Sequence, residues 1–208
     1  SVHHWHAVGL GAWLEEQARP WERWISHRLL GCPTLAITLS AFNSPDALRF
    51  RPHRSEVVAN GVPDPCPDFD TTLASLRRQR HRDRQAGGIV RVLFLAHCTP
   101  DKGIFDALEA VALANANEQG QPAAQRLDFH LDVAGSFVTP EDEARYQERI
   151  ARPDLSSRVR TLGFVKGEAK SACLRSADLF LFPSYYANEG QPLNLIEATA
   201  HGLVPVTT

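Results

Sequence analysis

The sequence of 208 residues contains no methionine, not even at position 1. It opens on Ser1 and lacks the charged and then apolar stretches that make up a signal peptide. The last residues, from Gly202 to Thr208, have the pattern of a strand that has begun when the sequence stops. We therefore expect the chain to be a piece of a longer protein.

Other deficits exclude whole classes of protein. No apolar run approaches the roughly 20 residues that a membrane-spanning helix needs. The formal net charge of −2 argues against a protein that coats nucleic acid. Hydrophobic residues make up 43% of the chain and charged residues 22%, which is ordinary for a folded globular protein.

Paired cysteines and metal-ligand spacings are missing as well. The four cysteines form no C-x-x-C pair, so we expect inert buried thiols in a reducing cytoplasm. They are Cys32, Cys66, Cys98 and Cys173. His3, His4 and His6 surround Trp5, but three histidines without a carboxylate are typical of a terminal or loop cluster. The sequence predicts no metal site.

Hydrophobic periodicity divides the chain into three zones, of which residues 1–62 are the first. Its expected elements are a helix over 11–30, a strand over 34–40, a short helix over 45–50 with Ser44 as its cap, and a strand over 56–59. The dipeptide Asn60-Gly61 then indicates a turn.

Residues 63–88 form a linker region that begins with three alternating prolines and ends with Gly87-Gly88. Five arginines crowd an expected helix inside it, namely Arg77, Arg78, Arg80, Arg82 and Arg84. Two interpretations are open: a solvated linker helix, or a basic patch that contacts anionic lipid head groups.

Residues 89–208 alternate between strand and helix patterns. The expected strands cover 90–95, 129–134, 159–164, 179–182 and 203–207, and the expected helices cover 104–114, 140–151, 168–176 and 192–201. Alternation with buried apolar strands predicts an α/β fold, a Rossmann-like parallel sheet flanked by helices. Ligands of such sheets bind at the carboxyl ends of the strands.

Lys102 and Gly103 follow the first of these strands, at the start of a helix. Unpaired N–H groups at a helix start favour a phosphate, glycine allows close approach, and lysine adds a positive charge. The alternative is an ordinary loop with a solvent-facing lysine. Gly163, just before Val165, follows the third strand, where it serves either a flat base lying against the backbone or a turn.

The segment after the fourth strand is the most informative one. Pro192 suits the first turn of a helix, where its missing N–H costs nothing. Gly190 and Gln191 place main-chain N–H groups at the positive end of that helix, facing a diphosphate or a sugar hydroxyl. Glu189 and Glu197, eight positions apart, can bind hydroxyls at two ends of one ligand.

Four blocks in register resemble the family-four group of retaining glycosyltransferases. They are Asn60-Gly61-Val62, residues 92–103, residues 162–165, and residues 177–184 with 189–202, and the similarity covers most of positions 56–208. The resemblance implies a two-domain GT-B fold with a nucleotide-diphosphate sugar in the cleft as donor substrate. Residues 1–62 would then be a remnant of the acceptor-side N-terminal domain, and 89–208 a nucleotide-sugar-binding domain truncated at its C-terminus.

The resemblance also implies roles for the residues of the site. Glu189 would hold donor-sugar hydroxyls, Glu197 the ribose, and Lys102 the diphosphate, whose negative charge grows as the glycosidic bond opens. Lys102 and Glu189 are thus the candidate catalytic residues. The expected donor-lining residues are Gly190, Gln191, Pro192 and Leu193 around the sugar and phosphates, Gly163 and Val165 at the base, and His97 and Gly103 beside the diphosphate. The family usually needs no metal, and no cofactor is implied.

His97 is a departure from the family pattern, because Ala96-His97 stand where the family has Gly-Arg. An arginine would neutralise a diphosphate at any pH, whereas a histidine does so only when protonated. This departure favours a second hypothesis, a nucleotide-binding module without turnover. A third is another GT-B enzyme, such as a sugar-nucleotide epimerase. A dehydrogenase is disfavoured because no G-x-G-x-x-G follows the strand over 90–95.

The leading hypothesis is an enzyme that moves a sugar to a hydroxyl of a carbohydrate or lipid-linked acceptor, in surface polysaccharide or glycolipid synthesis. It would work in the cytoplasm, with peripheral contact to the membrane, and without a nucleic-acid partner.

Overall fold

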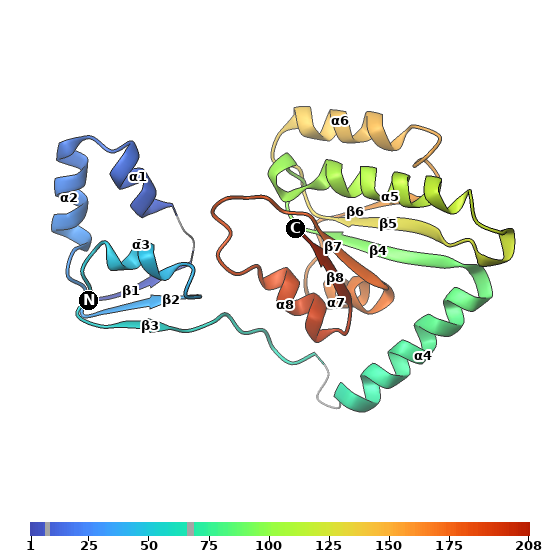
Figure 1. Ribbon diagram of the computed structural model, residues 1–208, viewed down its shortest axis with the longest axis horizontal. Helices are drawn as coiled ribbons and strands as arrows, with labels where there is room; N and C mark the ends of the chain where they lie inside the picture. Colours follow the sequence, from blue (N-terminus) through green and yellow to red (C-terminus); the bar gives the residue numbers. More distant parts are fainter. Residues whose placement is uncertain (7–8, 66–68) are drawn as a thin grey trace. The chain divides into compact units, whose positions relative to one another are not determined.

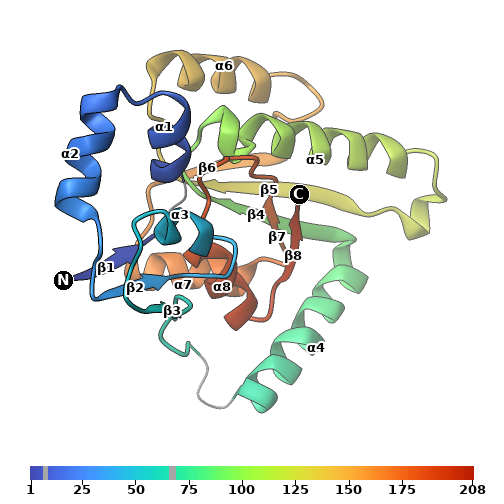
Figure 2. The ribbon, with the colours of Figure 1, turned by 60° about the vertical axis from the view of Figure 1, so that its left-hand side comes forward.

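The computed structural model describes residues 1–6, 9–65 and 69–208 and divides into two compact units (Figures 1 and 2). The first unit comprises Ser1–Val62 together with Tyr186–Leu193. The second comprises Pro63–Tyr185 and Asn194–Thr208. The residues expected to form a linker therefore lie in the second unit. Cys66 lies outside the described residues.

The first unit is built on a parallel three-stranded sheet of order β1-β2-β3. Its elements are β1 (Val2–Trp5), α1 (Leu10–Glu16), α2 (Pro20–Leu30), β2 (Leu35–Thr38), α3 (Ser44–Leu48) and β3 (Ser55–Val57). Trp5, Leu14, Ala36 and Phe50 belong to its small buried core.

Two expectations for this unit were wrong. The helical pattern over 11–30 is two helices, because Pro20 has no N–H to continue the first and instead starts the second. Ser44 is the first residue of α3 and not its cap, since its hydroxyl donates to the carbonyl oxygen of Ser40 at 3.2 Å. Of the histidines expected in a terminal or loop cluster, His3 and His4 lie in the terminal strand β1, which is paired in register with β2, and His6 follows it.

The second unit contains a five-stranded, wholly parallel sheet of order β6-β5-β4-β7-β8. Its strands are β4 (Ile89–Leu95), β5 (Asp128–Ala134), β6 (Val159–Gly163), β7 (Leu179–Phe182) and β8 (Val204–Thr207). Its α-helices are α4 (Phe69–Gly87), α5 (Ile104–Glu118), α6 (Pro140–Ile150), α7 (Gly167–Ser176) and α8 (Leu193–Ala200), with short 3₁₀ turns at Pro100–Lys102 and Ala123–Gln125. The predicted parallel sheet flanked by helices is confirmed.

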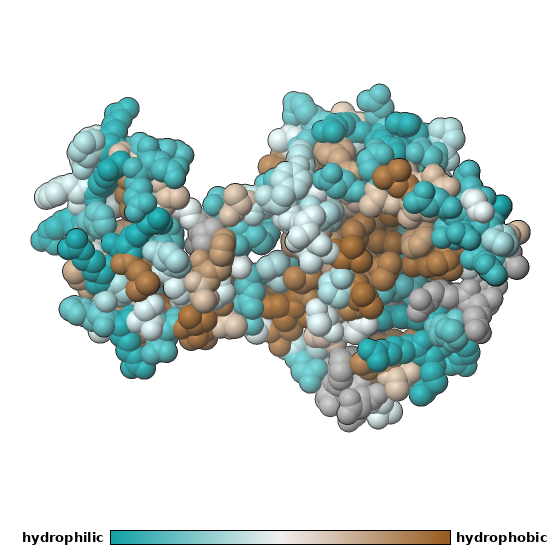
Figure 3. All heavy atoms as spheres, viewed as in Figure 1, coloured by the Kyte–Doolittle hydropathy of each residue, from teal (hydrophilic) through white to brown (hydrophobic). Residues whose placement is uncertain are grey.

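Two separate cores cover the two faces of this sheet. Along β4, Val92 and Phe94 point to the face covered by α5 and α6, and Leu93 and Leu95 to the face covered by α7 and α8 (Figure 2). Alternation of apolar side chains to both faces explains why a central parallel strand is a continuous apolar run. Hydrophobic surface remains over α8 and the edge strand β8 (Figure 3).

Helix α4 does not behave as a fully solvated linker. Arg80 is buried and donates hydrogen bonds to the carbonyl oxygens of Gly202 at 3.0 Å and Arg175 at 3.3 Å. Arg77, Arg78 and Arg82 are exposed, and the side chain of Arg84 lies outside those that the structure describes. No helix in the described part of the chain is long and apolar enough to cross a membrane.

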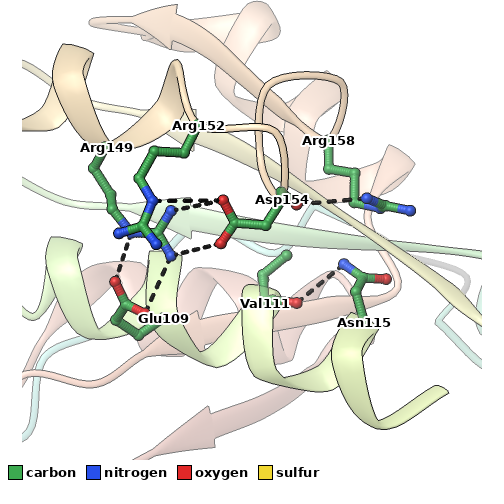
Figure 4. Close-up of polar contacts among 7 residues, drawn as sticks. All are labelled: Glu109, Val111, Asn115, Arg149, Arg152, Asp154 and Arg158. Carbon is green, nitrogen blue, oxygen red and sulfur yellow. Dashed lines mark hydrogen bonds and ion pairs between the residues drawn. The ribbon is translucent and has the colours of Figure 1, made fainter. Parts of the chain in front are cut away.

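Arg149 joins α6 to α5 through a network of charge-assisted hydrogen bonds (Figure 4). Its guanidinium donates to both carboxylate oxygens of Glu109, at 2.6 and 3.1 Å, and to both of Asp154, at 3.2 and 3.0 Å. These hydrogen bonds lower the pKa of Glu109 and the pKa of Asp154 below their ordinary values of 4.5 and 3.8. The network therefore fixes helix α6 against the outer face of α5.

The Arg149→Ala substitution should lower the free energy of unfolding by about 1–2 kcal/mol near neutral pH, because solvent partly screens the two carboxylates. Arg152→Ala is the matched control: this arginine is 63% exposed and 3.9 Å from Asp154, and should cost less than about 0.5 kcal/mol. Urea unfolding measures both values.

The effect of Arg149→Ala should depend on pH with a defined sign. Since both carboxyl pKa values are lowered in the folded state, their contribution is present above the ordinary values and lost as pH falls through the folded-state values. The difference between wild type and variant should shrink below about pH 4. A difference that stays constant down to pH 2 would contradict this assignment.

Candidate functional site

Backbone hydrogen bonds join the loops that follow β4, β5 and β6. Ala96 N donates to Ala134 O at 3.2 Å, and Gly135 N donates to Gly163 O at 2.9 Å. Cys98 N donates to the carbonyl of Ser136 at 2.9 Å. The carboxyl edge of the sheet, where an α/β fold binds ligands, is thus one continuous backbone platform.

Gly103 lies where this platform meets the end of β7. It has a left-handed backbone, with φ +77°, and is the N-cap of α5. It is buried, and a β-carbon there would collide with the carbonyl oxygen of Pro183. Tyr185 N donates to Asp101 O at 3.0 Å, which is a second link between the two strand ends. The predicted phosphate-binding turn and the predicted sugar-binding segment therefore start side by side.

Lys102 and His97 occupy this turn. The Lys102 ammonium lies 6.0 Å from the centre of the Phe182 ring, at the carboxyl end of β7. His97 is exposed. The Lys102 ammonium and the first turn of α5 thus lie at one edge of the sheet, which is the arrangement of an anion site at a helix start.

Helix α8 begins at the same edge. The side-chain amide of Asn194 donates to the carbonyl oxygen of Leu95, the last residue of β4, at 2.6 Å. The starts of α5 and α8 are both tied to the end of the central strand. Asn194, the second residue of α8, was not among the predicted site residues, because its role comes from a contact with a strand 99 positions away along the chain.

The carboxylate of Glu197 forms an ion pair with the ammonium of Lys170, on the neighbouring helix α7. Both side chains are partly buried, at 24% and 29% exposure. Lys170 was not among the predicted site residues, because a single lysine in a polar helix does not indicate a binding site by itself. The ion pair fixes the position of the carboxylate that the resemblance assigns to a ribose.

The expected base-binding residues are at the exit of β6. Gly163 has φ +67°, and a β-carbon there would have no heavy atom within 4 Å. Val165 packs partly buried against the core shared by α7 and α8. The backbone at Gly163 is therefore open to a flat group, and its left-handed conformation, rather than crowding, requires glycine.

The segment from Glu189 to Leu193 belongs to the first unit. Asn60 binds it twice: its backbone N–H donates to the Gln191 side-chain oxygen at 2.6 Å, and its amide donates to the Gln191 carbonyl at 3.1 Å. A β-carbon on Gly190 would collide with the carbonyl oxygen of His6. Pro192 immediately precedes α8, as expected for a proline at a helix start.

Glu189, Gly190, Gln191, Pro192 and Leu193 are in the first unit; His97, Lys102, Gly103, Gly163, Val165 and Glu197 are in the second. Asn60, expected at a turn and in the first block of the resemblance, holds the Gln191 loop in the structure.

The cysteines differ from the expected uniform burial. Cys98 is buried beneath the β4 loop, and burial raises the pKa of its thiol to about 11, so it stays protonated at neutral pH. Cys32 is exposed, which corrects the expectation of buried thiols throughout. Among the described residues, no group of three or more His, Cys, Asp and Glu could hold a metal ion.

Comparison with known proteins gives a consistent family. Residues 78–208, more than half of the chain, match the family described as glycosyl transferases group 1. The amylovoran biosynthesis glycosyltransferase AmsK of Erwinia amylovora is 32% identical over 123 residues, which are 57% of this chain and 28% of that protein. The putative colanic acid biosynthesis glycosyltransferase WcaL of Salmonella typhimurium is 30% identical over 138 residues, which are 64% of this chain and 31% of that protein.

Solved structures share the fold. Anabaena Alr3699/HepE in complex with UDP and glucose superposes with a TM-score of 0.64 at 20% identity, over 99% of this chain and 52% of that one. WaaG, a glycosyltransferase involved in lipopolysaccharide biosynthesis, gives a TM-score of 0.65 at 18% identity, over 99% of this chain and 55% of that one. The chain thus spans about half the length of these structures and less than a third of the two curated relatives.

Two glycines with the same left-handed backbone allow a controlled test of the strand-end contact. Gly103→Ala should cost more than about 3 kcal/mol, because strain and the collision with Pro183 add. Gly163→Ala should cost about 1–2 kcal/mol, because only the strain applies. Thermal and urea unfolding of the two variants compare these values, and equal losses would show that the packed contact contributes nothing.

Proposed function

Because the chain belongs to the group 1 glycosyl transferases, we propose that it is the donor-binding part of a retaining enzyme that transfers a sugar from a nucleotide-diphosphate sugar to a hydroxyl acceptor. The observation that carries this proposal is the contact of Gly103 with Pro183, which brings the Lys102 turn beside the end of β7. A diphosphate bound there would meet both a lysine and the N-terminus of α5.

The mechanism that follows is stabilisation of the leaving group. Negative charge grows on the nucleotide diphosphate as the glycosidic bond breaks, and Lys102 with the N–H groups of α5 opposes that charge. The acceptor hydroxyl would attack from the face that the leaving group departs, which retains configuration. We assign no nucleophile on the enzyme and no metal. Glu189 would bind hydroxyls of the donor sugar.

The ribose would bind at Glu197. A carboxylate accepts hydrogen bonds from both hydroxyls of a ribose, and the ion pair with Lys170 holds this one in place. The fold neighbour Alr3699/HepE was solved with UDP-glucose, which makes UDP the first nucleotide to test.

The acceptor we propose is a carbohydrate or lipid-linked hydroxyl compound, made in the cytoplasm for a surface polysaccharide or glycolipid. The names of the two curated relatives, which concern polysaccharide biosynthesis, support this choice. Peripheral membrane contact would use the exposed arginines of α4, Arg77, Arg78 and Arg82.

A second candidate function is nucleotide binding without turnover. The exposed His97 favours it, because a histidine opposes the charge of a leaving diphosphate only when protonated, whereas an arginine does so at any pH. Donor binding with no transfer or hydrolysis of the sugar by the full-length protein would support this alternative.

Calorimetric titration tests the donor site. We expect UDP or another nucleoside diphosphate to bind, Lys102→Ala to weaken it by about 10-fold or more, and Glu197→Gln to weaken both the nucleotide and its sugar conjugate by a similar factor. Glu168→Gln is the matched control, because this carboxylate pairs with Arg175 on an exposed part of α7. A folded chain that binds no member of a UDP, GDP, ADP and TDP panel would overturn the site assignment.

Lys170→Met tests whether the ion pair positions the ribose carboxylate. We expect about 3- to 10-fold weaker binding of the free nucleotide and of the nucleotide sugar alike, because both contain the ribose. The double variant Lys170→Met, Glu197→Gln should bind no more weakly than Glu197→Gln alone. Fully additive losses would show that Lys170 acts independently of Glu197.

A further inference from the structure

We propose that the first unit contains a second anion site, a phosphate-binding pocket formed by α1, α2 and the segment that follows α3. The pocket has a volume of about 610 Å³. All of its lining residues lie between positions 11 and 51, so it shares none with the proposed donor site. It does not depend on the proposed function.

The charge of the lining fits a phosphate. Arg23, Arg49 and Arg51 line the pocket together with Glu15 and His27. Arg49 is also paired with Asp46, so the three arginines exceed the two acids by one positive charge. Phosphate suits guanidinium groups better than a carboxylate does, because it offers three acceptor oxygens and carries roughly 1.5 to 2 negative charges at pH 7.

The guanidinium groups are not equally available. Arg49 is engaged, donating to Glu15 at 2.8 and 3.0 Å and to Asp46 at 3.0 Å. Arg23 donates from Nε and Nη2 to the carbonyl oxygens of Ala18 and Glu15, respectively. Its Nη1 group is left to donate to a ligand.

The guanidinium of Arg51 forms no hydrogen bond or ion pair with any other group in the part of the chain that the structure describes. Arg51 and Arg23 thus provide open N–H donors, while the Arg49–Glu15 pair forms one wall. Planar guanidinium groups bind phosphate through two parallel hydrogen bonds. Arg51 and Arg23 are therefore the groups that we expect to contact the phosphate.

Backbone strain marks the same pocket independently of charge. Cys32, with φ 52°, and Arg51, with φ 51°, are the two non-glycine residues with a left-handed backbone among positions 1–6, 9–65 and 69–208, and both line the pocket. Cys32 N donates to the carbonyl oxygen of Phe50 at 2.7 Å, which joins the two strained turns. Such conformations cost about 1–3 kcal/mol each and cluster at ligand sites.

Helix α2 also presents an apolar surface beside the pocket. Its outward residues Trp21, Trp24, Ile25 and Leu29 are 56%, 68%, 39% and 74% exposed. At about 100° per residue they form one stripe, while the polar His27 faces Phe50. An amphiphilic phosphate would contact both the pocket and this apolar stripe, and the experiment below separates that source from free phosphate.

Tryptophan fluorescence gives a readout specific to this unit, because all four tryptophans, Trp5, Trp13, Trp21 and Trp24, lie in residues 1–62. Titration with potassium phosphate against potassium chloride at equal ionic strength should give a saturable change with phosphate only. Arg51→Gln should weaken that binding by about 10-fold or more.

Arg23→Gln should weaken phosphate binding as well, and it provides a second test if Arg51→Gln does not fold. Arg54→Gln, which removes an exposed arginine paired with Glu56 outside the pocket, should change the binding less than 2-fold. Equal effects of Arg51→Gln and Arg54→Gln would overturn the pocket.

Vesicles distinguish the source of the phosphate. Phosphatidylcholine vesicles with and without phosphatidic acid are titrated under the same conditions, with the same variants. If phosphatidic acid vesicles give saturable binding and Arg51→Gln abolishes it, the pocket binds a lipid phosphate. If only inorganic phosphate gives saturable binding, the pocket binds a soluble phosphate. If neither probe gives an Arg51-dependent change, the proposal is wrong. Nucleotide-sugar binding in the second unit is read separately by calorimetry, so the two proposals can fail independently.

Discussion

The backbone of Gly103 lies directly against the carbonyl oxygen of Pro183, and the geometry of the candidate site depends on this contact. Strands β4 and β7 are neighbours in the sheet, and the contact packs the Lys102 turn, which follows β4, against the end of β7. A side chain larger than hydrogen at position 103 would push the Lys102 turn away from the end of β7.

The remaining parts of the site are held by polar contacts of different kinds. Asn194 ties the start of α8 to the end of β4, and Lys170 holds the carboxylate of Glu197. Asn60 binds the Gln191 loop within the first unit. These contacts position backbone groups and one carboxylate, which suits a site that works by binding charge and hydroxyls rather than by covalent catalysis.

The α/β fold, the strands of the second unit and the family were predictable, and each is confirmed, because buried parallel strands are short apolar runs and the four sequence blocks keep their order. Strand β1 was not predictable. Its sequence contains two adjacent histidines and shows no alternation of apolar and polar residues, and it pairs with β2 through backbone groups. Lys170 and Asn60 could not be assigned either, because their roles come from contacts with Glu197 and Gln191, 27 and 131 positions away along the chain.

Hydrogen exchange with and without a nucleotide sugar tests the central claim most directly, because it locates the ligand by residue. If the donor binds where β4 and β7 end, amides of the first turns of α5 and α8 and the backbone near Gly163 should exchange more slowly with UDP-glucose, while those of α6 should not change. Binding that protects none of these segments, or protects only helices remote from the carboxyl ends of the strands, would contradict the account.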